Sequence, residues 1–86
     1  MNGRIDYWSA SWCQPCHTLK PKVIKLAAKH GFEFVEHDVD VETDEALDKH
    51  LLGVPTLFVQ APDALFPIVV TSTMATLPQI RKAMGV

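Results

Sequence analysis

Two cysteines near the start of the chain are the side chains best suited to chemistry. Cys13 and Cys16 are separated by two residues and are the only cysteines among the 86 residues. A disulfide between them would close so small a loop that it would restrain little of the unfolded chain, which makes it a weak stabilising cross-link. The spacing is more typical of a redox-active thiol pair or of half a zinc site.

The zinc alternative lacks ligands. A structural zinc ion is usually held by four side chains, and the sequence has no second cysteine pair to complete the set. His17 or His37 would have to supply the missing ligands. We therefore favour redox chemistry and expect neither a metal nor another cofactor beyond the disulfide itself.

The elements around the cysteines are predicted to place them at the start of a helix. Residues 4–9 are rich in β-branched and aromatic side chains and predict a strand, whereas residues 14–30 carry apolar side chains at helical spacing. A cysteine at a helix N-terminus gains thiolate character from the free N–H groups and the helix dipole. Cys13 is therefore predicted to be the nucleophile. Cys16, one turn deeper, is the predicted resolving thiol, and Pro15 suits the first helical turn.

The rest of the chain alternates short elements. The pattern predicts a strand over residues 32–39, then a short helix capped by Asp40 or Thr43 and ending near Leu52. A hairpin of residues 56–60 and 66–71 follows, and Thr76 is predicted to cap a last helix through Met84. The order β-α-β-α-β-β-α predicts an α/β fold in which three helices flank a four-stranded mixed sheet.

The motifs together resemble the thioredoxin family over nearly the whole chain. They are Trp12-Cys13-Gln14-Pro15-Cys16, the helix proline Pro21, and Gly53-Val54-Pro55-Thr56 before the hairpin. The short length is similar to that of glutaredoxins and of compact phage-encoded relatives, but the segment between the cysteines is of the thioredoxin type. The Gly-Gly that helps glutaredoxins hold glutathione is missing, so we expect protein disulfides as substrates.

The resemblance implies which residues bind the substrate. The Val54-Pro55 bond is expected to be cis and to face the cysteines, where the Val54 backbone would pair with an extended substrate segment. Thr73 aligns near the glycine that opens the family's substrate groove, and its bulk would alter partner choice. The implied substrate-binding set is Trp12, Gln14, Pro15, Val54, Pro55 and Thr73.

The resemblance also implies an activity. Cys13 and Cys16 would reduce protein disulfides, ribonucleotide reductase being a common target of compact relatives, and a thioredoxin-reductase-like donor would return the electrons. Two alternatives stay open. The chain could be a redox-inactive thioredoxin-like module that binds a partner, or an oxidant or isomerase rather than a reductant.

One buried family residue has no obvious counterpart. Aligned without gaps on Cys13, Tyr7 rather than Asp6 takes the place of the family's buried aspartate, and Glu36 falls near the place of its lysine partner. Asp6 could take that role only if a bulge absorbed one residue. Tyr7 is otherwise expected to be a packed strand residue.

Charge and composition exclude several classes of partner. The net charge of −2 gives no basic field for nucleic acid, and no apolar run is long enough to span a membrane. Eight of the ten acidic residues lie between residues 33 and 48, whereas four of the eight basic residues lie between 20 and 29. Such runs usually mark solvated faces, but they could steer a charged partner. We expect a monomeric, cytoplasmic protein with one domain over residues 1–86.

Overall fold

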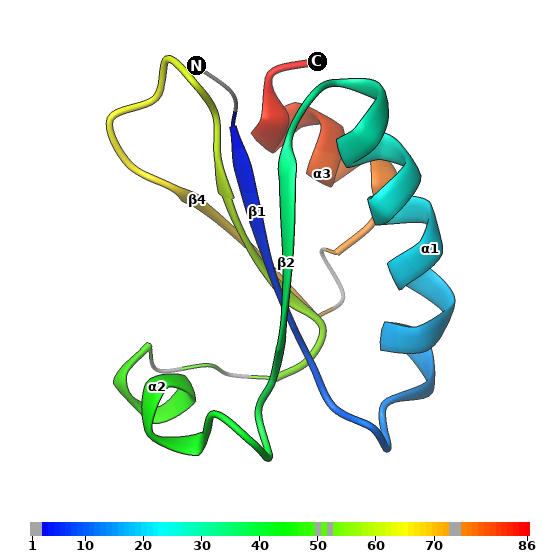
Figure 1. The fold of residues 1–86 in the computed structure, drawn as a ribbon, viewed down its shortest axis with the longest axis vertical. Helices are drawn as coiled ribbons and strands as arrows, with labels where there is room; N and C mark the ends of the chain where they lie inside the picture. Colours follow the sequence, from blue (N-terminus) through cyan, green and yellow to red (C-terminus); the bar gives the residue numbers. More distant parts are fainter. Residues whose placement is uncertain (1–2, 50, 52, 73–74) are drawn as a thin grey trace.

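The fold is built on a four-stranded sheet. In the computed structural model, which describes residues 3–49, 51, 53–72 and 75–86, the strands lie in the order β2-β1-β3-β4 (Figure 1). The strands are β1 (Arg4–Ser9), β2 (Glu33–Asp38), β3 (Thr56–Gln60) and β4 (Ile68–Thr71). The central strand β1 runs parallel to β2 and antiparallel to β3, and β3 runs antiparallel to β4. The sheet is therefore mixed, as predicted.

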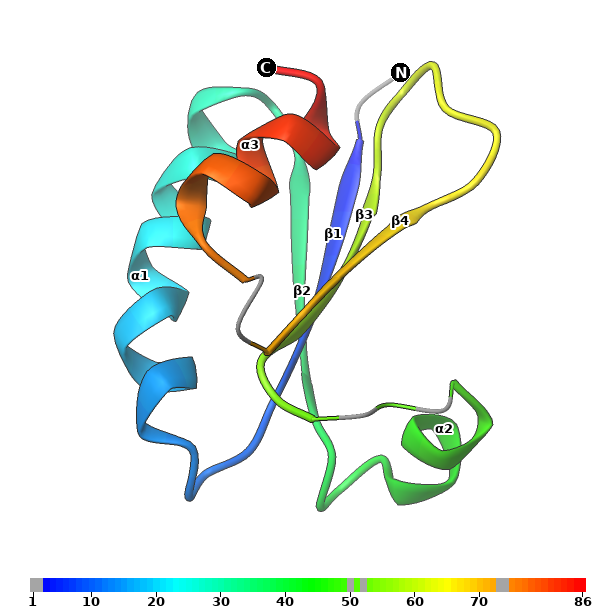
Figure 2. The same ribbon diagram turned by 180° about the vertical axis from the view of Figure 1, so that it is seen from behind.

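Within the described part of the chain, three helices flank this sheet. They are α1 (Gln14–Lys29), α2 (Thr43–Asp48) and α3 (Leu77–Met84). Helices α1 and α3 lie together on one face, and the short α2 lies toward the other face, beside the end where β1 and β2 finish (Figures 1 and 2). The parallel pair β1 and β2 requires a crossover, which α1 provides. Two glycines with positive φ follow the helices on this face, Gly31 at 72° and Gly85 at 80°. This left-handed conformation is one that glycine adopts readily.

The core lies between the sheet and the α1–α3 layer. Ile5 and Tyr7 point into it from β1, and neither side chain is exposed. Strand residues alternate between faces, so Asp6 and Trp8 lie on the opposite face of the sheet. The other buried members of the core are Val23, Leu26, Ala27, Phe32, Leu57, Val59, Val70, Ala75, Ile80, Ala83 and Met84.

The start of α2 differs from the prediction. Neither Asp40 nor Thr43 caps the helix; the N-cap is Glu42, and its side chain makes no capping hydrogen bond. The carboxylate of Asp40 instead accepts a hydrogen bond from Trp12 Nε1, and Glu42 contacts His37. The helix also ends earlier than predicted, at Asp48. Other contacts use the two side chains predicted to cap the helix: Asp40 accepts from Trp12, 28 residues away, and the Thr43 hydroxyl donates to the nearby Val39 and Asp40 carbonyls.

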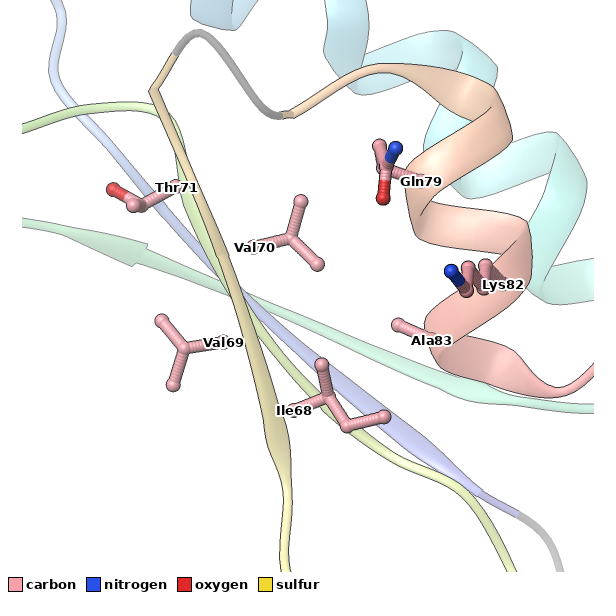
Figure 3. A pocket seen from close by; sticks show the side chains of 7 residues that line it. All are labelled: Ile68, Val69, Val70, Thr71, Gln79, Lys82 and Ala83. Atoms are coloured by element: carbon pink, nitrogen blue, oxygen red, sulfur yellow. The ribbon is translucent and has the colours of Figure 1, made fainter.

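A cavity on the edge strand lies apart from the cysteines. It has a volume of about 380 Å³ and lies between β4 and α3, with Val70 pointing toward the helix and Val69 away from it (Figure 3). Neither cysteine lines it. Among residues 3–49, 51, 53–72 and 75–86, no helix has the length and apolar character needed to cross a membrane.

Candidate active site

Cys13 and Cys16 are joined by a disulfide where β1 passes into α1. Their Cα atoms are 5.3 Å apart. Cys13 is the N-cap of α1, and its Sγ accepts a hydrogen bond of 3.2 Å from the backbone N–H of Cys16. The two residues are 5% and 1% exposed, so Cys16 is the more buried of the pair. In the reduced protein the same N–H and the helix dipole would stabilise a thiolate on Cys13.

Local sequence explains this placement. Strand β1 ends at Ser9, and the Cys13 N–H donates to the Ala10 carbonyl at 3.1 Å, which closes the turn. Pro15 lies in the first turn of α1, where its missing N–H costs no helical hydrogen bond. The turn and the proline together place both sulfurs at the start of the helix.

The loop before β3 packs against the sulfurs. Ala10, Cys13 and Cys16 form a small buried cluster, against which Val39 and Val54 pack. The peptide bond between Val54 and Pro55 is cis, and the Ser72 N–H donates to the Pro55 carbonyl at 2.7 Å. The segment that follows β4 thus holds the proline loop beside the disulfide.

Trp12 forms one wall of an apolar groove next to the disulfide. Its side chain is 69% exposed, and its Nε1 donates to Asp40 at 3.0 Å, which fixes the ring. The groove beside Trp12 has a volume of about 290 Å³. It is lined by Trp12, Val39, Thr43, Ala46, Leu47, Leu51, Gly53 and Val54. An exposed ring fixed beside an apolar groove offers a contact surface for another polypeptide.

The predicted site residues are distributed over this surface. Trp12 and Val54 line the groove, Gln14 and Pro15 are exposed on the first turn of α1, and Pro55 is buried. Thr73 lies outside the described residues. Sequence reasoning missed Val39, Asp40, Leu47, Leu51 and Ser72 as parts of the site. Of these five residues, the sequence singled out only Asp40. It predicted Asp40 as a helix cap, and the structure shows that this role is wrong.

Tyr7 occupies the position beneath Cys16. The register between β1 and β2 pairs their residues one for one, with Tyr7 opposite Glu36, so no bulge brings Asp6 into the core. The buried Tyr7 hydroxyl donates to the Cys16 carbonyl at 2.6 Å. Burial and then the negative charge of Glu36 raise the pKa of Tyr7 to about 12. At neutral pH the group beneath Cys16 is therefore a hydrogen-bond donor rather than a carboxylate.

Asp6 belongs to a separate polar network on the other face of the sheet. Its carboxylate accepts from Arg4 at 2.9 Å and lies 2.8 Å from His37 Nε2. His37 Nδ1 lies 3.0 Å from Glu42, and the imidazole stacks on Trp8 with 4.4 Å between ring centroids. Burial lowers the pKa of His37, but the hydrogen bonds to Asp6 and Glu42 outweigh it and leave the pKa raised. Burial by itself raises the pKa of Asp6. The hydrogen bonds with Arg4 and His37 outweigh burial, so the pKa of Asp6 is lowered overall.

This network makes stability depend on pH. Because the folded-state pKa of His37 is raised, its stabilising contribution is full below the ordinary value of 6.5 and is lost as pH rises through the folded pKa. We expect the free energy of unfolding of the parent to fall above about pH 6.5 relative to that of a His37→Gln variant. Urea unfolding of both proteins at a series of pH values measures the difference. A constant difference across that range would contradict the prediction.

The zinc alternative gains no ligands from the fold. Within the part of the chain that the structure describes, no group of three or more His, Cys, Asp or Glu side chains is placed to hold a metal ion. The His17 ring lies 2.9 Å from the Ser11 carbonyl, and His37 is bound between two carboxylates on the other face of the sheet.

Comparison with known proteins identifies similar sequences. The thioredoxin family model matches residues 4–83. Thioredoxin H8 of Arabidopsis thaliana is 43% identical over 51 residues, which cover 58% of this chain and 34% of that protein. A thioredoxin of Mycolicibacterium smegmatis is 32% identical over 57 residues, covering 62% of this chain and 50% of its own length. The chain thus spans a third to a half of these relatives.

Solved structures share the fold. Thioredoxin 1 of Thermosipho africanus superposes with a TM-score of 0.83 at 17% identity, over 95% of this chain and 90% of that one. Chloroplastic thioredoxin z gives the same TM-score at 25% identity, over 98% of this chain and 76% of that one. The family match covers far more than half of the chain and includes the Cys-x-x-Cys pair and the proline loop. The chain belongs to the thioredoxin family.

Proposed function

We propose that the chain is a thiol–disulfide oxidoreductase that reduces disulfides in other proteins. The observation that carries the proposal is the Cys13–Cys16 pair at the start of α1, with the Cys16 N–H directed at Cys13 Sγ. Family membership and the apolar groove beside Trp12 support it. A redox-inactive binding module would have no need of a nucleophilic sulfur at a helix N-terminus.

The proposed reaction moves two electrons in two exchanges. The Cys13 thiolate attacks one sulfur of the target disulfide, whose S–S bond breaks, and the other target sulfur leaves as a thiolate and takes up a proton. Cys16 then loses its proton and attacks Cys13 Sγ in the mixed disulfide. The second target sulfur is released and protonated, and the Cys13–Cys16 disulfide remains. An external dithiol donor must return two electrons.

The surroundings of the cysteines support reduction rather than oxidation. The thiolate of Cys13 would be stabilised by one N–H and a helix terminus, and among the described residues no Lys or Arg side chain lines the groove beside Trp12. A very stable thiolate would make the disulfide a strong oxidant, whereas moderate stabilisation favours a reductant.

The finer assignments of the proposal are a single cytoplasmic domain acting as a monomer, ribonucleotide reductase as a substrate, and a thioredoxin-reductase-like donor.

The reduction potential of the Cys13–Cys16 pair tests the direction of electron flow. The protein would be equilibrated in graded thiol–disulfide buffers, and free thiols would be counted by mass after alkylation. We expect a potential near the ~−270 mV of reducing thioredoxins. A potential near ~−120 mV would make the protein an oxidant, and a pair that never exchanges with the buffer would make it a redox-inactive module. Insulin reduction by the reduced protein provides the matching activity measurement.

A further inference from the structure

A second groove lies between α1 and α3 and is lined by cations. It has a volume of about 310 Å³. Its floor is apolar, Leu26 and Leu77, and its rim carries four positive side chains, three from α1 and one from α3. We call it the basic groove, and its lining is Lys22, Lys25, Leu26, Lys29, Leu77 and Arg81.

The spacing of the lysines places them on one side of the helix. Lys22, Lys25 and Lys29 follow one another at intervals of three and four residues, which on an α-helix share a face. They extend along about 10 Å of the helix axis at 1.5 Å per residue. Arg81 approaches from α3 across the apolar floor. The cations therefore lie on both sides of the groove, with three lysines along the α1 side and Arg81 on the α3 side, rather than in a point cluster.

No acidic side chain on either helix offsets these charges. Helices α1 and α3 contain no Asp or Glu, and the ion pairs among the described residues involve Arg4, Lys20 and His37 instead. Most of the acidic residues lie in the stretch 33–48, outside the two helices. Like charges three and four residues apart on a helix repel one another. A bound anionic group would relieve this repulsion.

The shape of the groove selects the kind of anion. A small anion such as phosphate would contact one end of the rim and leave the leucines bare. An extended segment with several carboxylates and an apolar side chain between them would engage both rims and the floor. We propose that the basic groove docks an acidic, leucine-containing segment of a partner protein.

The docking site is separate from the redox site. None of the residues lining the basic groove lines the groove beside Trp12 or belongs to the cluster around the disulfide. A partner held there would leave the exposed Trp12 ring and the groove beside it uncovered. The inference therefore does not depend on the proposed oxidoreductase activity, and each can fail without the other.

A peptide titration tests the proposal on the oxidised, full chain. The probe is a capped 12-residue peptide built from Glu-Glu-Leu repeats, and the control peptide carries Gln in place of Glu. We expect the Glu peptide to shift the backbone amide signals of residues 22–29, 77 and 79–82 in ¹⁵N-edited NMR spectra. Its affinity should fall as ionic strength rises, because exposed charges are screened by salt.

Charge-neutral variants make the test specific. The double variant Lys25→Gln/Arg81→Gln should weaken peptide binding about fivefold, the middle of the range expected for the loss of two exposed ion pairs. The matched control Lys20→Gln/Lys49→Gln removes the same net charge from outside the groove, where Lys20 pairs with Glu36 and Lys49 lies over the Phe58 ring. It should bind the peptide within about twofold of the parent. Signal dispersion in the spectra of both variants reports that they are folded.

Several outcomes would overturn the proposal. If both double variants weakened peptide binding equally, the net charge of the protein, and not the basic groove, would explain the effect. Equal binding of the Gln peptide would exclude carboxylate recognition, and signal shifts confined to residues outside the two helices would place the peptide elsewhere. Tighter binding of polyphosphate or a DNA oligonucleotide than of the Glu peptide would assign the groove to another class of polyanion.

Discussion

Replacing Cys13 with serine is expected to reduce insulin reduction below detection, whereas replacing Cys16 with serine is expected to stop the reaction half-way. A serine hydroxyl at the N-cap of α1 is not ionised at neutral pH and cannot attack a disulfide, although it can still accept the N–H of residue 16. With Cys16→Ser the first exchange still proceeds, and no second sulfur is present to release the target. The variant should accumulate a mixed disulfide between Cys13 and the target.

Mass spectrometry of the quenched reaction measures this intermediate directly. The adduct should be the main species for Cys16→Ser, absent for Cys13→Ser and minor for the parent. Thr18→Ala, which changes an exposed residue of α1, is the control and should keep the parent rate. If the adduct instead accumulated with Cys13→Ser, the roles of the two sulfurs would be exchanged.

The second large effect is expected at Tyr7. Its side chain is completely buried among the core residues, so Tyr7→Ala removes an aromatic ring that few neighbours can replace. The expected loss is about 3–5 kcal/mol in the free energy of unfolding, as for other buried aromatic residues cut back to alanine. Tyr7→Phe keeps the ring and loses only the hydrogen bond to the Cys16 carbonyl, which should cost about 1 kcal/mol.

Chemical denaturation of the parent, Tyr7→Ala and Tyr7→Phe measures these differences in the free energy of unfolding.

The Tyr7→Phe variant also decides whether the Tyr7 hydroxyl exchanges protons with Cys16. Because the pKa of Tyr7 is about 12, the hydroxyl keeps its proton throughout the neutral range. Tyr7→Phe should therefore leave the shape of the pH–rate profile unchanged near neutrality. Loss of a rate-controlling ionisation in this variant would show that the phenol acts as an acid or base.

Much of the fold follows from local patterns. Strands β1 and β3 have the predicted bounds, and α1 covers Gln14–Lys29, because β-branched runs and helical apolar spacing are local signals. Strands β2 and β4 start one and two residues later than predicted, at Glu33 and Ile68. The positions of Cys13 and Cys16 at the β1–α1 junction were predictable for the same reason, since both flanking elements are strongly patterned.

Features set by partners distant in sequence were not predictable. Asp40 is of a residue type that often caps helices. Its carboxylate instead accepts a hydrogen bond from Trp12, which lies 28 residues away in the sequence. The sequence indicated His37 only as a possible zinc ligand, and its place between Asp6 and Glu42 depends on the register of β1 and β2. The choice between Asp6 and Tyr7 likewise needed that register, because a single bulge would have exchanged their faces.

The six-residue length of α2 has a consequence for how the surface behaves over time. The helix buries none of its residues, and helices so short gain little stability from their own hydrogen bonds. Such a segment opens locally at a small fraction of the free energy that unfolds the core. Three lining residues of the groove beside Trp12, Thr43, Ala46 and Leu47, lie on it, whereas the sulfurs are held by β1 and α1. The α2 wall of this groove can therefore rearrange to different shapes while the two sulfurs keep their geometry.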